Sequence, residues 1–233
     1  MNKLLQIFFF SAFSVLIAQY NGDNFSISLG YNYTTSSKLF LNPDAPDVLD
    51  QNQYVEIGDF QNFSVDFRYR LNEDIIFGLN AEYFENTANG RNLSSPLFVV
   101  EDGFKVYPVE LSIYYFLPFS TEDFKFFMGG GIGFYFGERI RNFGDVQFVT
   151  VNKELGYGIQ VSSGMDYMVF DNISVRGEIH FRDPDFKVTN KYNTSTVNYD
   201  GNVYRISGNN TTSKINIDGI TFRLGASFQF SIF

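Results

Sequence analysis

The feature that most constrains the fold is a period of two in hydrophobicity, clearest from Leu155 to Arg182. Over residues 157–169 bulky side chains occupy alternate positions, and small or polar residues such as Gly158 lie between them. The alternation resumes after the pair Asp171–Asn172 and continues to Arg182. Successive side chains of a β-strand point to opposite faces. This stretch therefore predicts a hairpin with one apolar face and one charged face.

The same alternation recurs along the chain and predicts eight strands, at residues 24–33, 63–71, 75–83, 107–115, 124–136, 157–169, 173–182 and 220–233. Short turns alternate with four long polar connections, at residues 34–59, 85–103, 138–154 and 183–218. Within the second, Leu97 to Val100 either extends a strand or folds over the connection. Strands of about ten residues can cross a hydrocarbon core when tilted. The expected fold is all-β: an eight-stranded antiparallel up-and-down transmembrane β-barrel.

Alternation alone does not say which face points outward, because a soluble barrel buries its apolar face whereas a membrane barrel exposes it to lipid. An eight-stranded lumen is only wide enough for its own side chains. The apolar face carries more than a dozen Phe and Tyr together with many Leu, Ile and Val, which would not all fit inside. The opposite face is rich in Gly and Ser. We therefore expect lipid outside and a polar network in the lumen, made of Asp66, Arg68, Arg70, Glu82, Glu110, Lys125, Asp166, Arg176, Glu178, His180, Arg182 and Arg223.

The N-terminus has the pattern of an export signal. Lys3 supplies a basic start, and an apolar run from Leu4 to Ala18 follows, which is too short to cross a bilayer comfortably. We expect residues 1–18 to be a cleaved signal peptide and residues 19–233 to form the barrel domain.

Composition excludes several classes of protein. A formal charge of −9 argues against nucleic acid, whose phosphates need clustered Lys and Arg. The chain has no Cys, which rules out a disulfide scaffold and a cysteine-based zinc or redox site. We expect no cofactor.

One segment adds a resemblance to a known group. The glycine-aromatic strand from Gly129 to Gly137, the following Gly164-Met165-Asp166-Tyr167, Glu178 and the terminal Phe233 resemble small bacterial outer-membrane β-barrel domains, the broad OmpA/OmpX/OmpW-like group. The resemblance implies a monomer in the bacterial outer membrane, in contact with its lipids and inserted by the outer-membrane insertion machinery. It also implies that Phe233 acts as an insertion signal, although Ile232, Phe230 and Phe228 are one residue out of phase with the usual pattern.

The remaining candidate sites favour a protein that is not an enzyme. His180 is the only histidine, and it shares the inward face with Glu178 and Arg182. Lipid A deacylases with this barrel carry a Ser two residues after the catalytic His, where this chain has Arg182, so a member of the polar network is the better interpretation. The acidic side chains of Asp44, Asp47, Asp50, Asp183 and Asp185 lack the spacing of a calcium loop, and we expect no metal site.

The leading functional hypothesis is a structural or surface-interaction role, with ligands or surfaces contacted through residues 34–59 and 183–218, because loops carry the residues that the barrel does not need. One alternative is an OmpW-like channel for small hydrophobic solutes, for which an inward apolar patch of Tyr114, Phe116, Phe127 and Tyr135 is the candidate. Another is a barrel subunit of a secretion or assembly machine.

Overall fold

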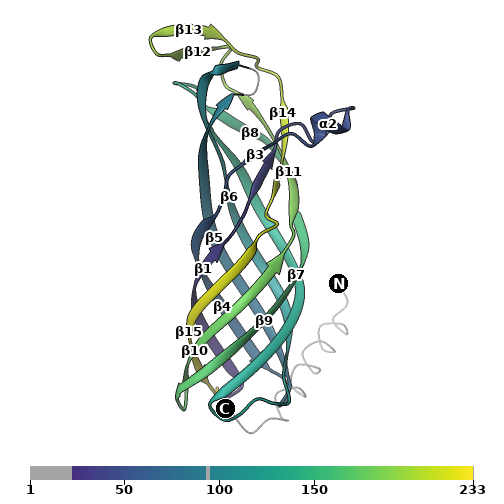
Figure 1. Ribbon diagram of the computed structural model, residues 1–233, viewed down its shortest axis with the longest axis vertical. Helices are drawn as coiled ribbons and strands as arrows, with labels where there is room; N and C mark the ends of the chain where they lie inside the picture. Colours follow the sequence, from purple (N-terminus) through teal and green to yellow (C-terminus); the bar gives the residue numbers. More distant parts are fainter. Residues whose placement is uncertain (1–22, 93–94, 233) are drawn as a thin grey trace, which may run out of the picture.

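The computed structural model describes residues 23–92 and 95–232, and within them it leaves the side chains of 91–97 undescribed. Eight long antiparallel strands form a closed barrel, which confirms the expected fold (Figure 1). They are β1 (Phe25–Thr34), β4 (Phe60–Arg70), β5 (Ile75–Asn92), β6 (Ser95–Phe116), β7 (Phe124–Asn142), β9 (Gly156–Phe170), β10 (Ile173–Arg182) and β15 (Ile220–Phe230). The last strand closes the barrel by pairing with both β1 and β10. The expected signal peptide and Phe233 lie outside the described residues.

One end of the barrel carries the three short turns and the C-terminus (Figure 1). In the turn between β4 and β5, the side chain of Asn72 accepts hydrogen bonds from the backbone N–H groups of Asp74 and Ile75, at 3.0 and 2.8 Å. Asn is favoured in such a turn because its side-chain oxygen can accept hydrogen bonds in place of a backbone carbonyl. We call this the turn end.

The opposite end extends into a second body of β-structure, so the four long connections, which the sequence predicts as loops, contain further strands. Strands β5, β6 and β7 run far past the predicted ends of their barrel segments. The connections add β2 (Lys38–Phe40), α2 (Val48–Gln51), β3 (Tyr54–Glu56), β8 (Phe148–Lys153), β11 (Asp185–Tyr192), β12 (Thr196–Tyr199), β13 (Asn202–Arg205) and β14 (Thr211–Asn216). We call this body the tower.

The tower is continuous with the barrel wall. Strand β11 pairs with β9 at Asp185 and Tyr157, then with β8 on one edge and with β14 on the other, and β14 leads on to β2 and β3. Apolar side chains of these strands pack onto rings at the top of the lumen, and the cluster contains Leu39, Ile57, Phe60, Phe84, Phe104, Val106, Tyr135, Phe186, Val188, Ile215 and Ile217. The tower therefore has an apolar core of its own, which explains why these polar connections are ordered.

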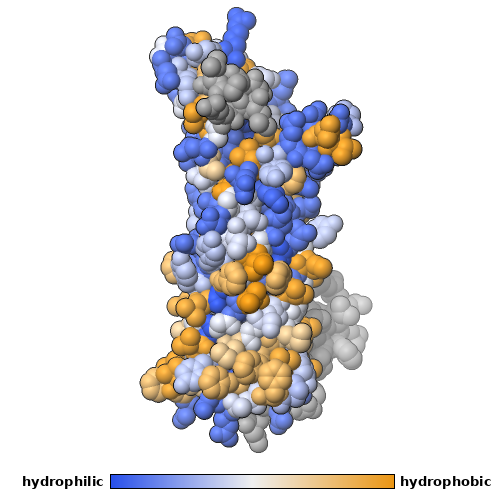
Figure 2. Space-filling view, viewed as in Figure 1, coloured by the Kyte–Doolittle hydropathy of each residue, from blue (hydrophilic) through white to orange (hydrophobic). Residues whose placement is uncertain are grey.

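The two faces of the barrel wall have opposite character. Outward side chains are apolar and exposed, as Leu29, Phe63 and Tyr157 illustrate, while their inward neighbours are small or charged and buried. Figure 2 shows the hydrophobic side chains gathered around the lower half of the molecule and hydrophilic ones covering much of the tower. Tyr83 and Tyr107 lie side by side where the wall meets the tower, with ring centroids 5.0 Å apart. Tyr is suited to the boundary between acyl chains and water because its ring is apolar and its hydroxyl is polar.

Among residues 23–92 and 95–232, no helix is long and apolar enough to cross a membrane.

Candidate functional site

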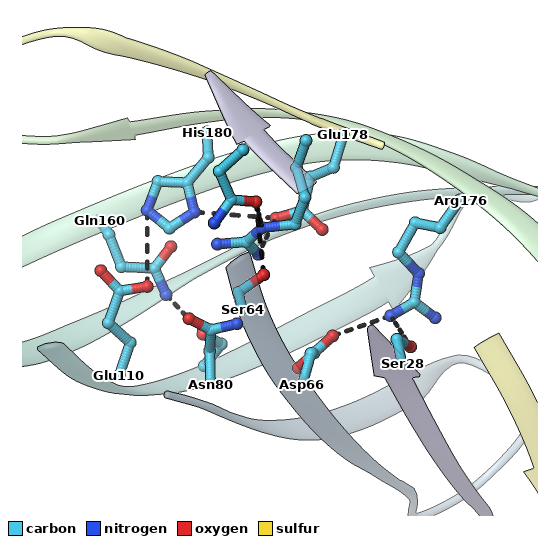
Figure 3. Close-up of polar contacts among 12 residues, drawn as sticks. Ser28, Ser64, Asp66, Asn80, Glu110, Gln160, Arg176, Glu178 and His180 are labelled. Atoms are coloured by element: carbon cyan, nitrogen blue, oxygen red, sulfur yellow. Dashed lines mark hydrogen bonds and ion pairs between the residues drawn. The ribbon is translucent and has the colours of Figure 1, made fainter. Parts of the chain in front are cut away.

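The lumen holds a continuous chain of ion pairs, and its lower part joins two aspartates to two arginines. Arg176 donates to both carboxylate oxygens of Asp166, from Nε at 2.6 Å and from Nη2 at 2.9 Å. Its Nη1 donates to Asp66 at 2.8 Å (Figure 3) and to Ser28 at 3.0 Å. Arg68 donates to the same Asp66 from Nε at 2.7 Å. All four charged side chains are buried, so each charge withdrawn from water is compensated by a neighbour.

The upper part of the chain crosses the lumen. Arg68 and Arg223 donate to the two oxygens of Glu178, at 2.9 and 3.2 Å. Arg223 also donates to Glu82 at 2.8 Å, and Arg182 joins the other oxygen of Glu82, at 3.1 Å, to Glu110 at 3.4 Å. Strands β5 and β10 are separated by three strands on either side of the ring, so the Arg182–Glu82 pair ties opposite walls together.

His180 lies between the carboxylates at the upper end of this chain. Its Nε2 is 3.7 Å from Glu110, and its Nδ1 is 3.7 Å from Glu178. Figure 3 shows the ring with a contact to each carboxylate. Five carboxylates and four arginines form the chain, which leaves one excess negative charge. The imidazole of His180 thus lies between two carboxylates of this chain, one on each side.

Two of the expected network residues lie elsewhere. Arg70 and Lys125 are half-buried near the turn end, below the chain of ion pairs. The guanidinium of Arg70 lies over the ring of Phe116, with its carbon 4.7 Å from the ring centroid. Lys125 is directly opposite Asp166 in the pairing of β7 with β9. The structure thus brings ten of the twelve expected residues into one network and places these two beside it.

Aromatic rings complete the network, and glycines make room for them. The Arg68 guanidinium lies 3.8 Å from the ring centroid of Tyr114 and 4.5 Å from that of Phe127. Such a stack of a cation on aromatic faces is stabilising when water is excluded. The Tyr114 ring fits because its neighbour on β7 is Gly129: an added Cβ there would lie 2.5 Å from a ring carbon.

This close approach yields a prediction for Gly129→Ala. We expect the variant to lose about 1–3 kcal/mol of unfolding free energy, because the methyl group would overlap the Tyr114 ring and the carbonyl of Ile113. Gly177→Ala on β10 is the matched control, since a Cβ there meets nothing within 4 Å, and it should be neutral or slightly stabilising. Urea titration in lipid vesicles measures both. Equal effects of the two substitutions would show that the glycine does not serve ring packing.

Some network residues escaped the sequence reasoning. The sequence pattern places Tyr135 in an apolar patch, yet its hydroxyl donates to Glu110 at 2.8 Å. Asn62 lay outside the predicted strand, and its side chain donates to Glu82 at 3.1 Å. A second buried pair, Arg139 with Asp102 at 2.7 Å, fell within stretches assigned to loops. Continuing the period of two past the predicted strand ends would have placed Asn62, Asp102 and Arg139 on the inward face.

The expected apolar patch is divided between two places. Tyr114, Phe116 and Phe127 cluster with Ile76 toward the turn end. Tyr135 belongs instead to the cluster that joins the barrel to the tower. The chain of ion pairs lies between these clusters, so the four rings do not line one continuous apolar path.

Known structures with this architecture are outer-membrane proteins. The outer membrane protein OprG from Pseudomonas aeruginosa matches with a TM-score of 0.63 at 15% identity, over 92% of this chain and 99% of that one. The outer membrane protein AlkL, determined in lipid bilayers, matches with a TM-score of 0.55 at 16% identity, over 92% and 93%. Ail, the attachment invasion locus protein of Yersinia pestis, matches with a TM-score of 0.43 at 13% identity, over 90% and 100%. At these identities the likeness is one of fold. No protein-family model and no curated protein matches the chain.

The closed barrel, its apolar exterior and the fold of its structural neighbours agree on one class. The chain is an eight-stranded outer-membrane β-barrel. It resides in the bacterial outer membrane, in contact with its lipids, as the resemblance implied. In such barrels the short turns face the periplasm and the long connections face the outside. The tower of this outer-membrane barrel is therefore extracellular.

The acidic side chains of the tower serve its internal structure. Asp44 pairs with Lys187 at 2.5 Å and Asp185 pairs with Lys214 at 3.3 Å. Asp47 caps α2 by accepting from the N–H of Leu49. A hydrogen bond from the Lys38 ammonium to Asp218 raises the pKa of Lys38. In the part of the chain that the structure describes, no three acidic, His or Cys side chains are grouped to hold a metal ion.

Proposed function

We propose that this outer-membrane barrel is a closed anchor that holds a rigid tower outside the cell for contact with other molecules or surfaces. The observation that carries this proposal is the ordered tower itself, whose strands pack around a core continuous with the top of the lumen. A connection needed only to join two barrel strands would be short. This protein instead uses several strands and an apolar core to hold surface residues in fixed positions.

Two exposed apolar features support a contact role. Val48 and Leu49 lie on α2, which projects sideways from the tower (Figure 1), and Leu49 is 79% exposed. Val203 and Tyr204 are exposed on the β12–β13 hairpin at the outer tip. Figure 2 shows the α2 projection as a hydrophobic spot surrounded by hydrophilic side chains. Exposed apolar groups with polar surroundings are typical of interaction sites.

The closed lumen gives a first test. Ion pairs across the lumen and the rings stacked above them, such as Phe60 on Phe84 at 4.5 Å, leave little room for ion flow. We expect the barrel reconstituted in planar bilayers to show no stable conductance. Stable currents of porin size would contradict the closed anchor. The packing also disfavours the solute channel, because the two ring clusters are separated by charge.

The contact role gives a second test. We expect cells that display the protein to adhere to hydrophobic surfaces. The double substitution Val48→Ser/Leu49→Ser should reduce adhesion several-fold, because it removes the exposed apolar pair. Val151→Ser is the control, as Val151 is also exposed on the tower but lies on β8. Adhesion equal to that of cells without the protein would contradict the proposed role. The hypothesis of a secretion or assembly subunit stays a prediction.

A further inference from the structure

A cavity of about 230 Å³ opens at the turn end of the barrel, below the chain of ion pairs. Arg68 and Arg176 lie at its inner end, and turn residues such as Glu122 and Asp171 line its rim. Because the short turns of an outer-membrane barrel face the periplasm, the cavity is accessible from that side. It is separate from the tower and from the role proposed above.

The walls of the cavity differ in character. Phe25, Ile76 and Phe116 supply apolar surface, and the last two belong to the ring cluster at the turn end. Arg68, Arg70, Lys125 and Arg176 supply positive charge. A ligand that fits both walls has an apolar body and an anionic head.

Arg68 has hydrogen-bonding capacity that the protein leaves unused. It is 2% exposed, its Nε donates to Asp66 and its Nη2 donates to Glu178, whereas Nη1 has no acceptor within the described structure. By contrast, Arg176 donates from all three nitrogens. A buried guanidinium N–H without an acceptor is costly. An anionic oxygen entering the cavity would remove that cost.

The surrounding acids select the charge of the ligand. Asp166 lines the same cavity, with both of its oxygens held by Arg176. With Asp23, Glu122 and Asp171, it gives the lining four negative charges, which equal its four positive charges in number. Such a balanced lining accommodates a monoanion more readily than a dianion such as a phosphate monoester. A carboxylate carries a single charge and can accept from both Arg68 and Lys125.

We propose that this cavity binds a small carboxylate with a short apolar body, taken up from the periplasmic side. The carboxylate head accepts from Arg68 and Lys125, and the apolar body packs against Ile76 and Phe116. Neither the tower nor its partners take part in this binding.

Hexanoate is a suitable probe, titrated into the folded full-length barrel in lipid nanodiscs and followed by backbone NMR shifts, with empty nanodiscs as the blank. We expect saturable shifts at Ser26, Ile76 and Lys125, and weaker binding of acetate, hexan-1-ol and hexyl phosphate by at least about tenfold. Binding of acetate as tight as that of hexanoate would overturn the role of the apolar wall. Equal binding of hexan-1-ol would overturn the role of the carboxylate, and equal binding of hexyl phosphate would overturn the choice of a monoanion.

Two substitutions test whether Lys125 and Arg68 bind the carboxylate of hexanoate. Lys125→Gln should weaken hexanoate binding at least about tenfold, while the charge-matched control Lys38→Gln, in the extracellular tower, should leave it unchanged. Ser26 lies opposite Arg68 in the pairing of β1 with β4, so Ser26→Glu should place a carboxylate beside Arg68 and abolish binding. Heat-modifiable migration on a gel confirms that each variant folds. Hexanoate binding that survives in folded Ser26→Glu, or that produces no shifts at the turn end, would overturn the proposal.

Discussion

Replacing Glu82 with glutamine is expected to lower the free energy of unfolding by about 3–5 kcal/mol, because it removes one charge from a buried group of ion pairs without removing volume. Glu82 accepts from Arg182 and Arg223, so each of these arginines would lose one of its two carboxylate partners and keep only Glu110 or Glu178. Urea unfolding in lipid vesicles, followed by circular dichroism and by gel mobility, measures the loss. The chain has no Trp, so indole fluorescence offers no signal.

Two further variants separate charge from other effects. Glu73→Gln removes an exposed carboxylate in a short turn and should change stability by less than about 0.5 kcal/mol. The double variant Glu82→Gln/Arg182→Gln removes both members of a pair, so its loss should be smaller than the sum of the two single losses. Strict additivity would show that the two side chains do not interact in the folded barrel.

Leu111→Arg is expected to cost about 2–4 kcal/mol, because it places a charge on the lipid-facing side of β6 near the middle of the barrel wall. Val151→Arg on β8 is the matched control, since both native side chains are 47% exposed. In the control the charge meets water, and the change should stay within about 0.5 kcal/mol. The same urea titration applies, and equal losses from the two substitutions would mean that lipid does not cover Leu111.

The period of two was sufficient to predict the barrel and the direction of its side chains. In β1, for example, Ser28, Gly30 and Asn32 are buried and the residues between them are exposed, as the alternation indicated. The narrow lumen decided which face of the sheet points outward, because an eight-stranded barrel cannot hold so many aromatic rings inside. These inferences succeed because they need only the side of the strand to which each side chain points, and this is a local property of a strand.

The pairing of charges could not be predicted in the same way. Arg182 meets Glu82, 100 residues away in the chain, because the stagger between neighbouring strands brings them to one height. Stagger is a property of the closed sheet. Because Arg182 points into the lumen, it could pair with any of several carboxylates. The alternation within one strand does not predict which of them it meets.

The tower was missed for a different reason. Strand β11 alternates buried Phe186 and Val188 with half-buried Lys187, but it is short and lies among Asn, Thr and Ser. Its order depends on Ile215 of β14 and Leu39 of β2, which pack against it from distant parts of the chain. A composition typical of loops can therefore form ordered strands when a core beneath supplies apolar contacts.

The central claim is that the rings and aliphatic side chains of the barrel wall face lipid while the charges face one another inside. Because the chain has no Cys, single spin labels can be attached at Leu111→Cys and Val151→Cys. Power-saturation measurements in lipid vesicles should find the label at position 111 accessible to oxygen and shielded from a water-soluble nickel complex, with the reverse at position 151. A label at position 111 that the nickel complex reaches, or that neither reagent reaches, would contradict the account.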